Sequence, residues 1–285
     1  MEPARFLIAV ATAAALLAGC AGPPASVSAT VTASAAASPT SATTPDQGLA
    51  SAAPTATGAP SATTAPPAAP ASATFGTPED AIQAYLAGVA KADPQAILAA
   101  CAIEEMSTGF HFDLYVDRLK AMILTTSLAP ATSPMYIAMN RAQLTTRAYS
   151  SVRNLTWSLL STEKIDGSTI VPADKARADA FTAAVDPGRL AAIRVVDVRL
   201  SMPSLQKSAT NLSNWAAQSA VYGADEMSEW VALISFESKQ YVVGFTMIRY
   251  GASWKVEQQV ANLAGTNSLG SAEPITTDGF DQITK

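Results

Sequence analysis

The spacing of apolar residues divides the chain into three parts. An apolar run, Phe6–Leu17, comes first. Residues 21–74 then consist almost entirely of Ala, Ser, Thr, Pro and Gly, without one aromatic residue. From Phe75 onward, apolar positions recur at helical spacing and later at strand spacing. We therefore expect a folded domain over residues 75–264, preceded by a segment that cannot form a core.

The stretch GTPEDAIQAYLAGVAKADPQAILAAC predicts two capped helices. Thr77 is an N-cap residue with Pro78 at the first helical position, and Asp93 repeats this signal before a second proline. The apolar residues fall on one face of each helix, which predicts that both pack against a core: Ile82, Tyr85, Leu86 and Val89 in the first, and Ile97, Leu98 and Cys101 in the second.

The middle of the chain predicts further helices. Residues Asp113–Leu124 have a mixed amphipathic pattern, and a short helix is expected within Pro172–Ala184. From Met135 to about Leu160 there is no Pro or Gly, and apolar residues recur at helical spacing, which predicts one long helix. We interpret the arginines of this helix as a solvated face: Arg141, Arg147 and Arg153.

The period of the apolar pattern changes in the C-terminal third. The β-branched run Ile193–Leu200 predicts a strand, and a helix around Trp215 is expected to stop at Gly223. Three more strands, separated by short connectors, predict an antiparallel meander: Glu229–Glu237, Tyr241–Tyr250 and Ser253–Ala261.

The last of these strands alternates in polarity. Trp254, Val256, Gln258 and Val260 alternate with Lys255, Glu257 and Gln259, which is typical of a strand with one face in the core and the other in solvent. The residues that follow, 265–285, are polar and contain Gly, so we expect a flexible C-terminal tail.

Helices first and a curved antiparallel sheet last make an α+β fold class. The helix starts at Thr77 and Asp93, with Tyr85 in the first helix, resemble the opening of NTF2-like and cystatin-like domains in exported bacterial proteins. The resemblance covers about 25 residues and implies a helix packed in the concave face of a bent sheet. The chain departs from that pattern by a helical insertion between Ile103 and Leu190.

The N-terminus has the organisation of a signal peptide. Arg5 precedes the apolar run, which is too short to span a bilayer. The sequence Leu17-Ala18-Gly19-Cys20 then resembles the lipobox of bacterial lipoproteins. The resemblance implies that a signal peptidase recognises Leu17, Ala18 and Gly19, and that Cys20 receives a diacylglycerol and becomes the mature N-terminus. The alternative is an ordinary secretory signal in which Cys20 is incidental.

The lipobox assigns residues 1–19 to the signal peptide and residues 20–74 to a lipidated cysteine with a disordered tether. Tethers of this composition resemble those of high-GC Gram-positive bacteria (actinobacteria). Two acyl chains hold a protein stably at a membrane, so we expect the chain at the extracytoplasmic face of the cell membrane. The net charge of −5, without a basic run, makes nucleic acid a poor partner.

The domain shows no recognisable catalytic or metal-binding set. His111 is the single histidine, so neither a Ser-His-acid triad nor an HExxH zinc site is supported, and we expect this side chain to be buried or half-buried. Cys101 has no cysteine partner once Cys20 is lipidated, and we interpret it as a small buried apolar residue. The adjacent Glu104 and Glu105 point apart on a helix, and no cofactor is expected.

Two classes of function remain open. The first is a non-catalytic binding or accessory module for a cell-envelope protein or a small apolar ligand. Its pocket would lie between helix and sheet, lined by aromatic residues that otherwise belong to the core: Trp215, Trp230, Phe245 and Trp254. The alternative is a cell-envelope hydrolase, which needs two carboxylates about 5–10 Å apart across a cleft. A solute-binding protein is a weaker third reading, because long βαβ units are not indicated.

Overall fold

The computed structural model describes residues 73–165 and 171–285, which belong to one compact unit. The predicted signal peptide, the lipobox with Cys20 and the tether up to residue 72 lie outside the described residues.

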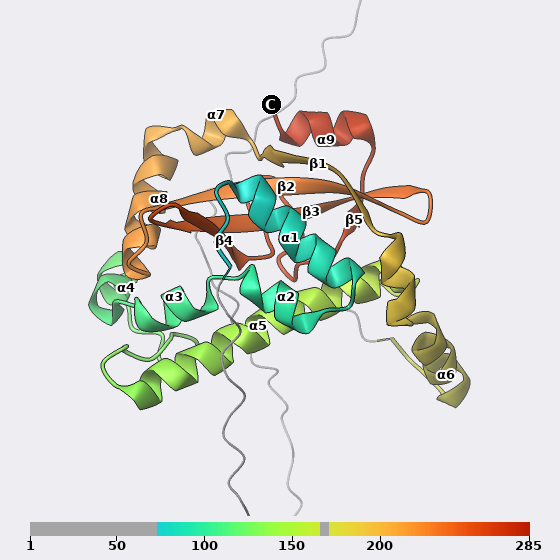
Figure 1. The fold of residues 1–285 in the computed structure, drawn as a ribbon, viewed down its shortest axis with the longest axis horizontal. Helices are drawn as coiled ribbons and strands as arrows, with labels where there is room; N and C mark the ends of the chain where they lie inside the picture. Colours follow the sequence, from blue (N-terminus) through green and yellow to red (C-terminus); the bar gives the residue numbers. More distant parts are fainter. Residues whose placement is uncertain (1–72, 166–170) are drawn as a thin grey trace, which may run out of the picture. The chain divides into compact units, whose positions relative to one another are not determined.

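An antiparallel sheet of five strands lies at the centre of the described part (Figure 1). The strand order is β1-β2-β3-β4, and β5 pairs with the part of β3 that β4 leaves open. The predicted first strand and the predicted meander are confirmed, with bounds that differ by a few residues: β1 Arg194–Leu200, then β2 Glu226–Phe236, β3 Lys239–Tyr250 and β4 Ser253–Gln258. The fifth strand, β5 Glu273–Pro274, was not predicted.

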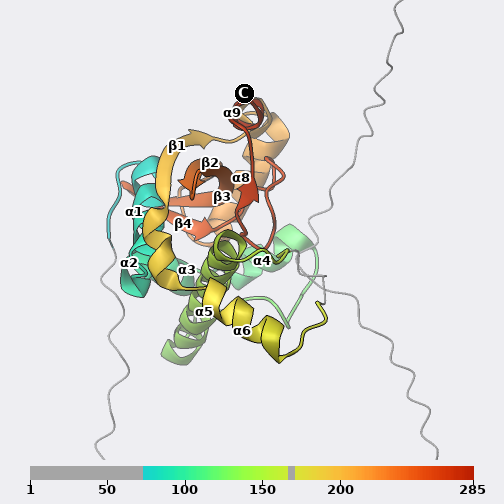
Figure 2. The ribbon, with the colours of Figure 1, turned by 90° about the vertical axis from the view of Figure 1, so that its right-hand side faces the viewer.

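The helices surround this sheet, and the α+β fold class is confirmed. Figures 1 and 2 show α5 beneath the strands and α9 on the opposite side, with α1 and α2 lying against one flank. The helices are α1 Pro78–Ala90, α2 Pro94–Ala99, α3 Ile103–Thr108, α4 Phe112–Leu119, α5 Pro134–Leu160, α6 Lys175–Ala184, the 3₁₀ helix η1 Pro187–Ala192, α7 Pro203–Gln206, α8 Ala209–Val221 and α9 Thr277–Ile283.

The helix starts are fixed by short local hydrogen bonds, as the sequence predicts. The Thr77 hydroxyl accepts from the Asp80 N–H at 3.1 Å, and the Asp93 carboxylate accepts from two N–H groups of α2. The Ser133 hydroxyl caps α5 in the same way. Each cap satisfies a backbone donor that the first helical turn leaves unpaired.

The main core cluster lies between α1, α5 and the sheet. The ring of Tyr85 meets Phe245 edge-on with centroids 5.6 Å apart, and Leu155 of α5 is completely buried beside them. Burying one large apolar side chain contributes about 1.5–3 kcal/mol. This layer therefore holds α1 and α5 to the strands.

The helix predicted to run to Leu124 ends earlier. Its last residue is Leu119, because Lys120 adopts a left-handed conformation with φ 52°. The next residues form an exposed loop in which Met122 and Leu124 are 57% and 68% exposed.

The C-terminal residues are not a loose tail. Residues 265–285 include β5, which extends the sheet, and α9, whose Phe280 is completely buried against β2 and β3. The prediction failed because one buried aromatic and one helix cap, at Thr276, are enough to fix a segment that is polar on average.

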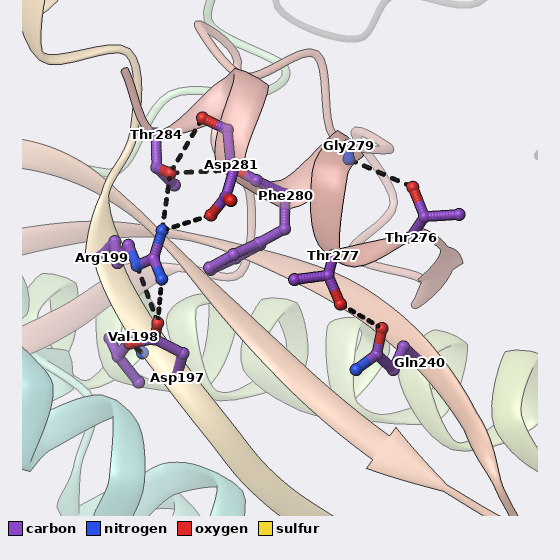
Figure 3. Close-up of polar contacts among 10 residues, drawn as sticks. All are labelled: Asp197, Val198, Arg199, Gln240, Thr276, Thr277, Gly279, Phe280, Asp281 and Thr284. Carbon is purple, nitrogen blue, oxygen red and sulfur yellow. Dashed lines mark hydrogen bonds and ion pairs between the residues drawn. The ribbon is translucent and has the colours of Figure 1, made fainter.

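An arginine on β1 contacts this last helix (Figure 3). Arg199 donates to Asp281 at 2.7 Å and to its strand neighbour Asp197 at 2.7 Å. Its guanidinium lies 5.2 Å from the centroid of the Phe280 ring, on the outer side of the buried aromatic. The chain end is thus tied to the sheet edge by both packing and charge.

Candidate functional site

A row of polar side chains on and just after β4 is buried. Lys255, Glu257 and Gln259 are 2%, 9% and 2% exposed. The prediction that they face solvent is wrong, because α1, α3 and α5 provide partners for all three. Burial of such groups is costly unless each finds a partner. With these partners the three side chains form a buried polar layer between the sheet and the helices.

The outer two members of the row bond to α3 and α1. Lys255 Nζ lies 3.1 Å from Glu105 Oε1 on α3. Gln259 accepts a hydrogen bond of 2.7 Å from the Tyr85 hydroxyl of α1 and donates to the Gly270 carbonyl oxygen. These bonds connect the sheet to the helices that flank it.

The middle member of the row pairs with α5. Arg147 Nη2 donates to Oε1 of Glu257 at 2.8 Å and to its carbonyl oxygen at 3.2 Å. Burial alone would lower the pKa of Arg147, but the Glu257 carboxylate and a hydrogen bond to Tyr222 outweigh it, and the pKa is raised. The guanidinium therefore keeps its charge inside a neutral pair.

The interpretation of the α5 arginines as one solvated face is wrong for two of the three. Arg141 donates to both carboxylate oxygens of Glu104 at 2.7 Å, and Arg147 is half-buried against Glu257. Arg153 is exposed and lies over the Trp157 ring. The difference arises because α3 and β4 lie against the N-terminal half of α5.

Arg147 lines two cavities. The smaller, about 20 Å³, is lined by Tyr85, Cys101, Glu257 and Gln259, and it has room for about one water molecule. The larger has a volume of about 140 Å³, close to that of cavities that hold one benzene molecule. We take the larger cavity as the candidate site.

Three aromatic rings form the apolar wall of the larger cavity. Phe110 lies between the other two, with centroid distances of 5.7 Å to Tyr115 and 5.9 Å to Tyr222. Leu128 and Leu144 complete the apolar lining. Arg147 is the single charged residue of the lining, and the other polar residues are Thr126, Ser127 and Gln143.

Close backbone approach holds Phe110 and Tyr222 together. The N–H of His111 donates to the Val221 carbonyl oxygen at 2.8 Å, and a Cβ on Gly109 would lie 2.6 Å from the Tyr222 carbonyl oxygen. That same oxygen accepts from the Tyr250 hydroxyl at 3.1 Å. The segment between α3 and α4 is therefore hydrogen-bonded to the end of α8. These backbone contacts set the positions of the Phe110 and Tyr222 rings.

The loop between α4 and α5 covers the cavity. Asn140 of α5 holds this loop by accepting from the Ala129 N–H at 2.7 Å and donating to the Ala129 oxygen at 2.8 Å. Gln143 donates to the Thr126 oxygen at 3.2 Å. Exposed apolar side chains gather on the loop and the start of α5: Met122, Ile123, Leu124, Met135 and Met139.

The aromatic residues predicted to line a pocket do not come together around either cavity. Phe245 is completely buried in the main core cluster, and Trp230 and Trp254 pack against its edge. Trp215 packs against a second cluster, which contains Phe110. The residues that do line the cavity carried one signal in the sequence, the aromatic run GFHFDLY at 109–115.

The structure places the other chemically active side chains apart. His111 is exposed, contrary to expectation, because it stands at the start of α4, where the chain leaves the core. Cys101 is buried as expected; burial raises the pKa of its thiol to about 12, so it stays protonated. Glu104 and Glu105 diverge to Arg141 and Lys255.

A buried carboxyl also lies on β2. Glu229 is 1% exposed, and its Oε2 accepts from the Leu263 N–H at 2.7 Å. Burial raises its pKa to about 7, although the N–H groups of Leu263 and Asn262 act in the opposite direction. Glu229 lines neither of the two cavities. Within residues 73–165 and 171–285, no cluster of three His, Cys, Asp or Glu side chains suits a metal ion.

Comparison with known proteins gives a likeness in fold alone. No protein-family model matches the chain, and no curated protein matches it significantly. The crystal structure of a cystatin-like protein from Ruminococcus gnavus, at 2.10 Å resolution, is similar with a TM-score of 0.48 and 18% identity. The match covers 70% of this chain and 44% of that protein, so this chain spans less than half of the length of the solved protein.

None of the helices in the described part is both long and apolar enough to cross a membrane.

Proposed function

We propose that this chain is an exported lipoprotein, held at the extracytoplasmic face of the cell membrane through Cys20, whose folded domain is a non-catalytic binding module. The cavity of about 140 Å³ behind Phe110 carries the binding part of the proposal. Its wall is aromatic, and its single charged group, Arg147, is already neutralised by Glu257. Such a lining provides an apolar surface and a few polar groups, Arg147 with Thr126, Ser127 and Gln143, which is the composition of a ligand site.

The anchoring part of the proposal rests on the sequence Leu17-Ala18-Gly19-Cys20 after an apolar run. A diacylated cysteine supplies the two acyl chains that stable membrane attachment requires. The long Ala/Ser/Thr/Pro segment then serves as a tether between the membrane and the domain that begins near Phe75.

A non-catalytic role is preferred to a hydrolase because the buried carboxyls are engaged in bonds within the domain. Glu257 is paired with Arg147, and Glu229 is bonded to the Leu263 N–H and lines neither cavity. A glycosidase needs two carboxyls that face each other across a cleft. The acids in and around the candidate site do not supply that pair.

Fractionation of cells that express the full chain tests the anchor. With native Cys20 the protein should partition into the membrane fraction and incorporate a labelled fatty acid. The Cys20→Ala variant should be released or left unprocessed without label, whereas a matched Cys101→Ala variant should behave as the native chain. Firm membrane attachment and labelling of the Cys20→Ala variant would refute the anchor.

A further inference from the structure

The larger cavity has the size of one aromatic ring. Its volume is about 140 Å³, and an apolar cavity of about 150 Å³ accommodates benzene. Phe110, Tyr115 and Tyr222 line this space, and the ring centroids of Tyr115 and Tyr222 lie 5.7 Å and 5.9 Å from that of Phe110. Aromatic pairs gain about 0.5–1.5 kcal/mol beyond the burial of area, so the wall favours a flat ring over an aliphatic group of the same volume.

Arg147 retains hydrogen-bonding capacity at the polar end of the cavity. A guanidinium carries five N–H donors. The bonds of Nη2 to Glu257 and the bond to Tyr222 occupy at most three of them. The side chain is 37% exposed and lines the cavity, so the remaining donors are available to an acceptor on a ligand.

The charge balance around Arg147 selects against an anion. Its positive charge is matched by the Glu257 carboxylate, whose side chain is only 3% exposed. The lining of the cavity supplies no second cation. A ligand carboxylate would therefore place an unbalanced negative charge against an apolar wall, which is costly. A carbonyl or amide oxygen accepts from the guanidinium without that cost.

We propose that this cavity binds a neutral molecule, or a neutral group of a larger one, that consists of one aromatic ring bearing a carbonyl or amide oxygen. The ring stacks among Phe110, Tyr115 and Tyr222, and the oxygen accepts from Arg147. This assignment rests on the proposed binding function and adds the chemical class of the ligand. Leu128, from the loop that covers the cavity, closes the site over the ring.

Three probes that share one benzene ring separate the elements of this proposal. Isothermal titration of the full-length protein with benzamide, toluene and benzoate gives the dissociation constants. Benzamide should bind about 10- to 100-fold more tightly than toluene, because a hydrogen bond to a charged donor contributes about 1.5–3 kcal/mol. Benzoate should bind more weakly than benzamide.

Two variants and a matched control locate the site. Leu128→Phe fills the cavity and should abolish binding of benzamide and toluene, whereas Leu212→Phe on the exposed face of α8 should leave both unchanged. Arg147→Met should reduce the affinity for benzamide to that for toluene. If this variant does not fold, Arg147→Met combined with Glu257→Gln removes the same donors without leaving a buried carboxylate unpaired.

Each contrary result has one meaning. Tighter binding of benzoate than of benzamide would overturn the neutrality of the ligand, and equal binding of benzamide and toluene would overturn the role of Arg147. Failure of all three probes would overturn the ring site as a whole. That failure is distinct from failure of membrane anchoring, which the Cys20→Ala fractionation decides.

Discussion

Arg147 Nη2 and Glu257 Oε1 lie 2.8 Å apart and join the middle of α5 to β4. The two partners are unequally buried, since the Arg147 side chain is 37% exposed and that of Glu257 only 3%. Removal of Arg147 therefore has a different consequence from removal of Glu257. A lone Arg147 can turn toward solvent, whereas a lone Glu257 stays buried without a cation.

This asymmetry predicts unequal stability losses. Glu257→Gln should lower the free energy of unfolding by about 1 kcal/mol, and Arg147→Met by about 3 kcal/mol because it strands a buried carboxylate. Urea unfolding of both variants and of the double variant measures this. Equal losses in the two single variants would contradict this prediction.

The polar row that contains Glu257 shows why the sequence predicted the sheet but not the site. Helix caps such as Thr77 with Asp80 act over three residues, so their signal is local and the helix starts were predictable. The partners of Lys255 and Glu257 are Glu105 and Arg147, more than 100 residues earlier in the chain. Polar alternation in a strand is the same whether water or another helix covers that face.

Glu229 predicts a pH dependence of stability. Burial raises its pKa from 4.5 to about 7 in the folded chain. Between these values the folded chain keeps a proton that the unfolded chain has lost, so stability falls as the pH rises. The full fall amounts to about 3 kcal/mol and ends above pH about 7.

The Glu229→Gln variant isolates this contribution. The free energy of unfolding of this variant should not show that fall. The variant should therefore become more stable relative to the native chain as the pH rises from about 5 to about 8. Urea unfolding midpoints of both proteins across this range provide the measurement, and the other titrating groups cancel in the difference. Parallel pH profiles for the two proteins would show that the carboxyl is not the source.

Phe280 makes the C-terminal helix part of the core. It is completely buried beside Val231 and Val242, so Phe280→Ala should destabilise the domain by about 3–5 kcal/mol. Val196→Ala on the exposed face of β1 is the matched control, with a change below about 0.5 kcal/mol. Thermal and urea unfolding give both values. A Phe280→Ala variant as stable as the control would show that the C-terminal helix does not contribute to the stability of the domain.

The sequence did contain a weak signal for this segment. Thr276 is an N-cap residue, and Phe280 and Ile283 are spaced for one helix face. The signal was outweighed by the polar composition of residues 265–285. A helix of seven residues is unstable alone. Its formation therefore depends on the sheet that Phe280 contacts and on the contacts of Arg199 with the helix (Figure 3).

Gly109 tests how the cavity wall is positioned. A methyl group there would lie 2.6 Å from the Tyr222 carbonyl oxygen and 2.9 Å from that of Glu105, so Gly109→Ala must push the end of α8 away from Phe110. We expect a folded protein with a stability loss of about 1–3 kcal/mol. Because Tyr222 lines the cavity, the affinity for benzamide should fall several-fold. A loss of this size corresponds to the contribution of one aromatic contact.

The matched control is Gly76→Ala, since nothing lies within 4 Å of a methyl group at Gly76. It should leave both the unfolding midpoint and benzamide binding unchanged. Titration of each folded variant with benzamide, after far-UV circular dichroism confirms native helix content, separates displacement of the wall from loss of the fold. Native affinity in Gly109→Ala would show that Tyr222 does not form the binding wall, since its backbone must move to admit the methyl group.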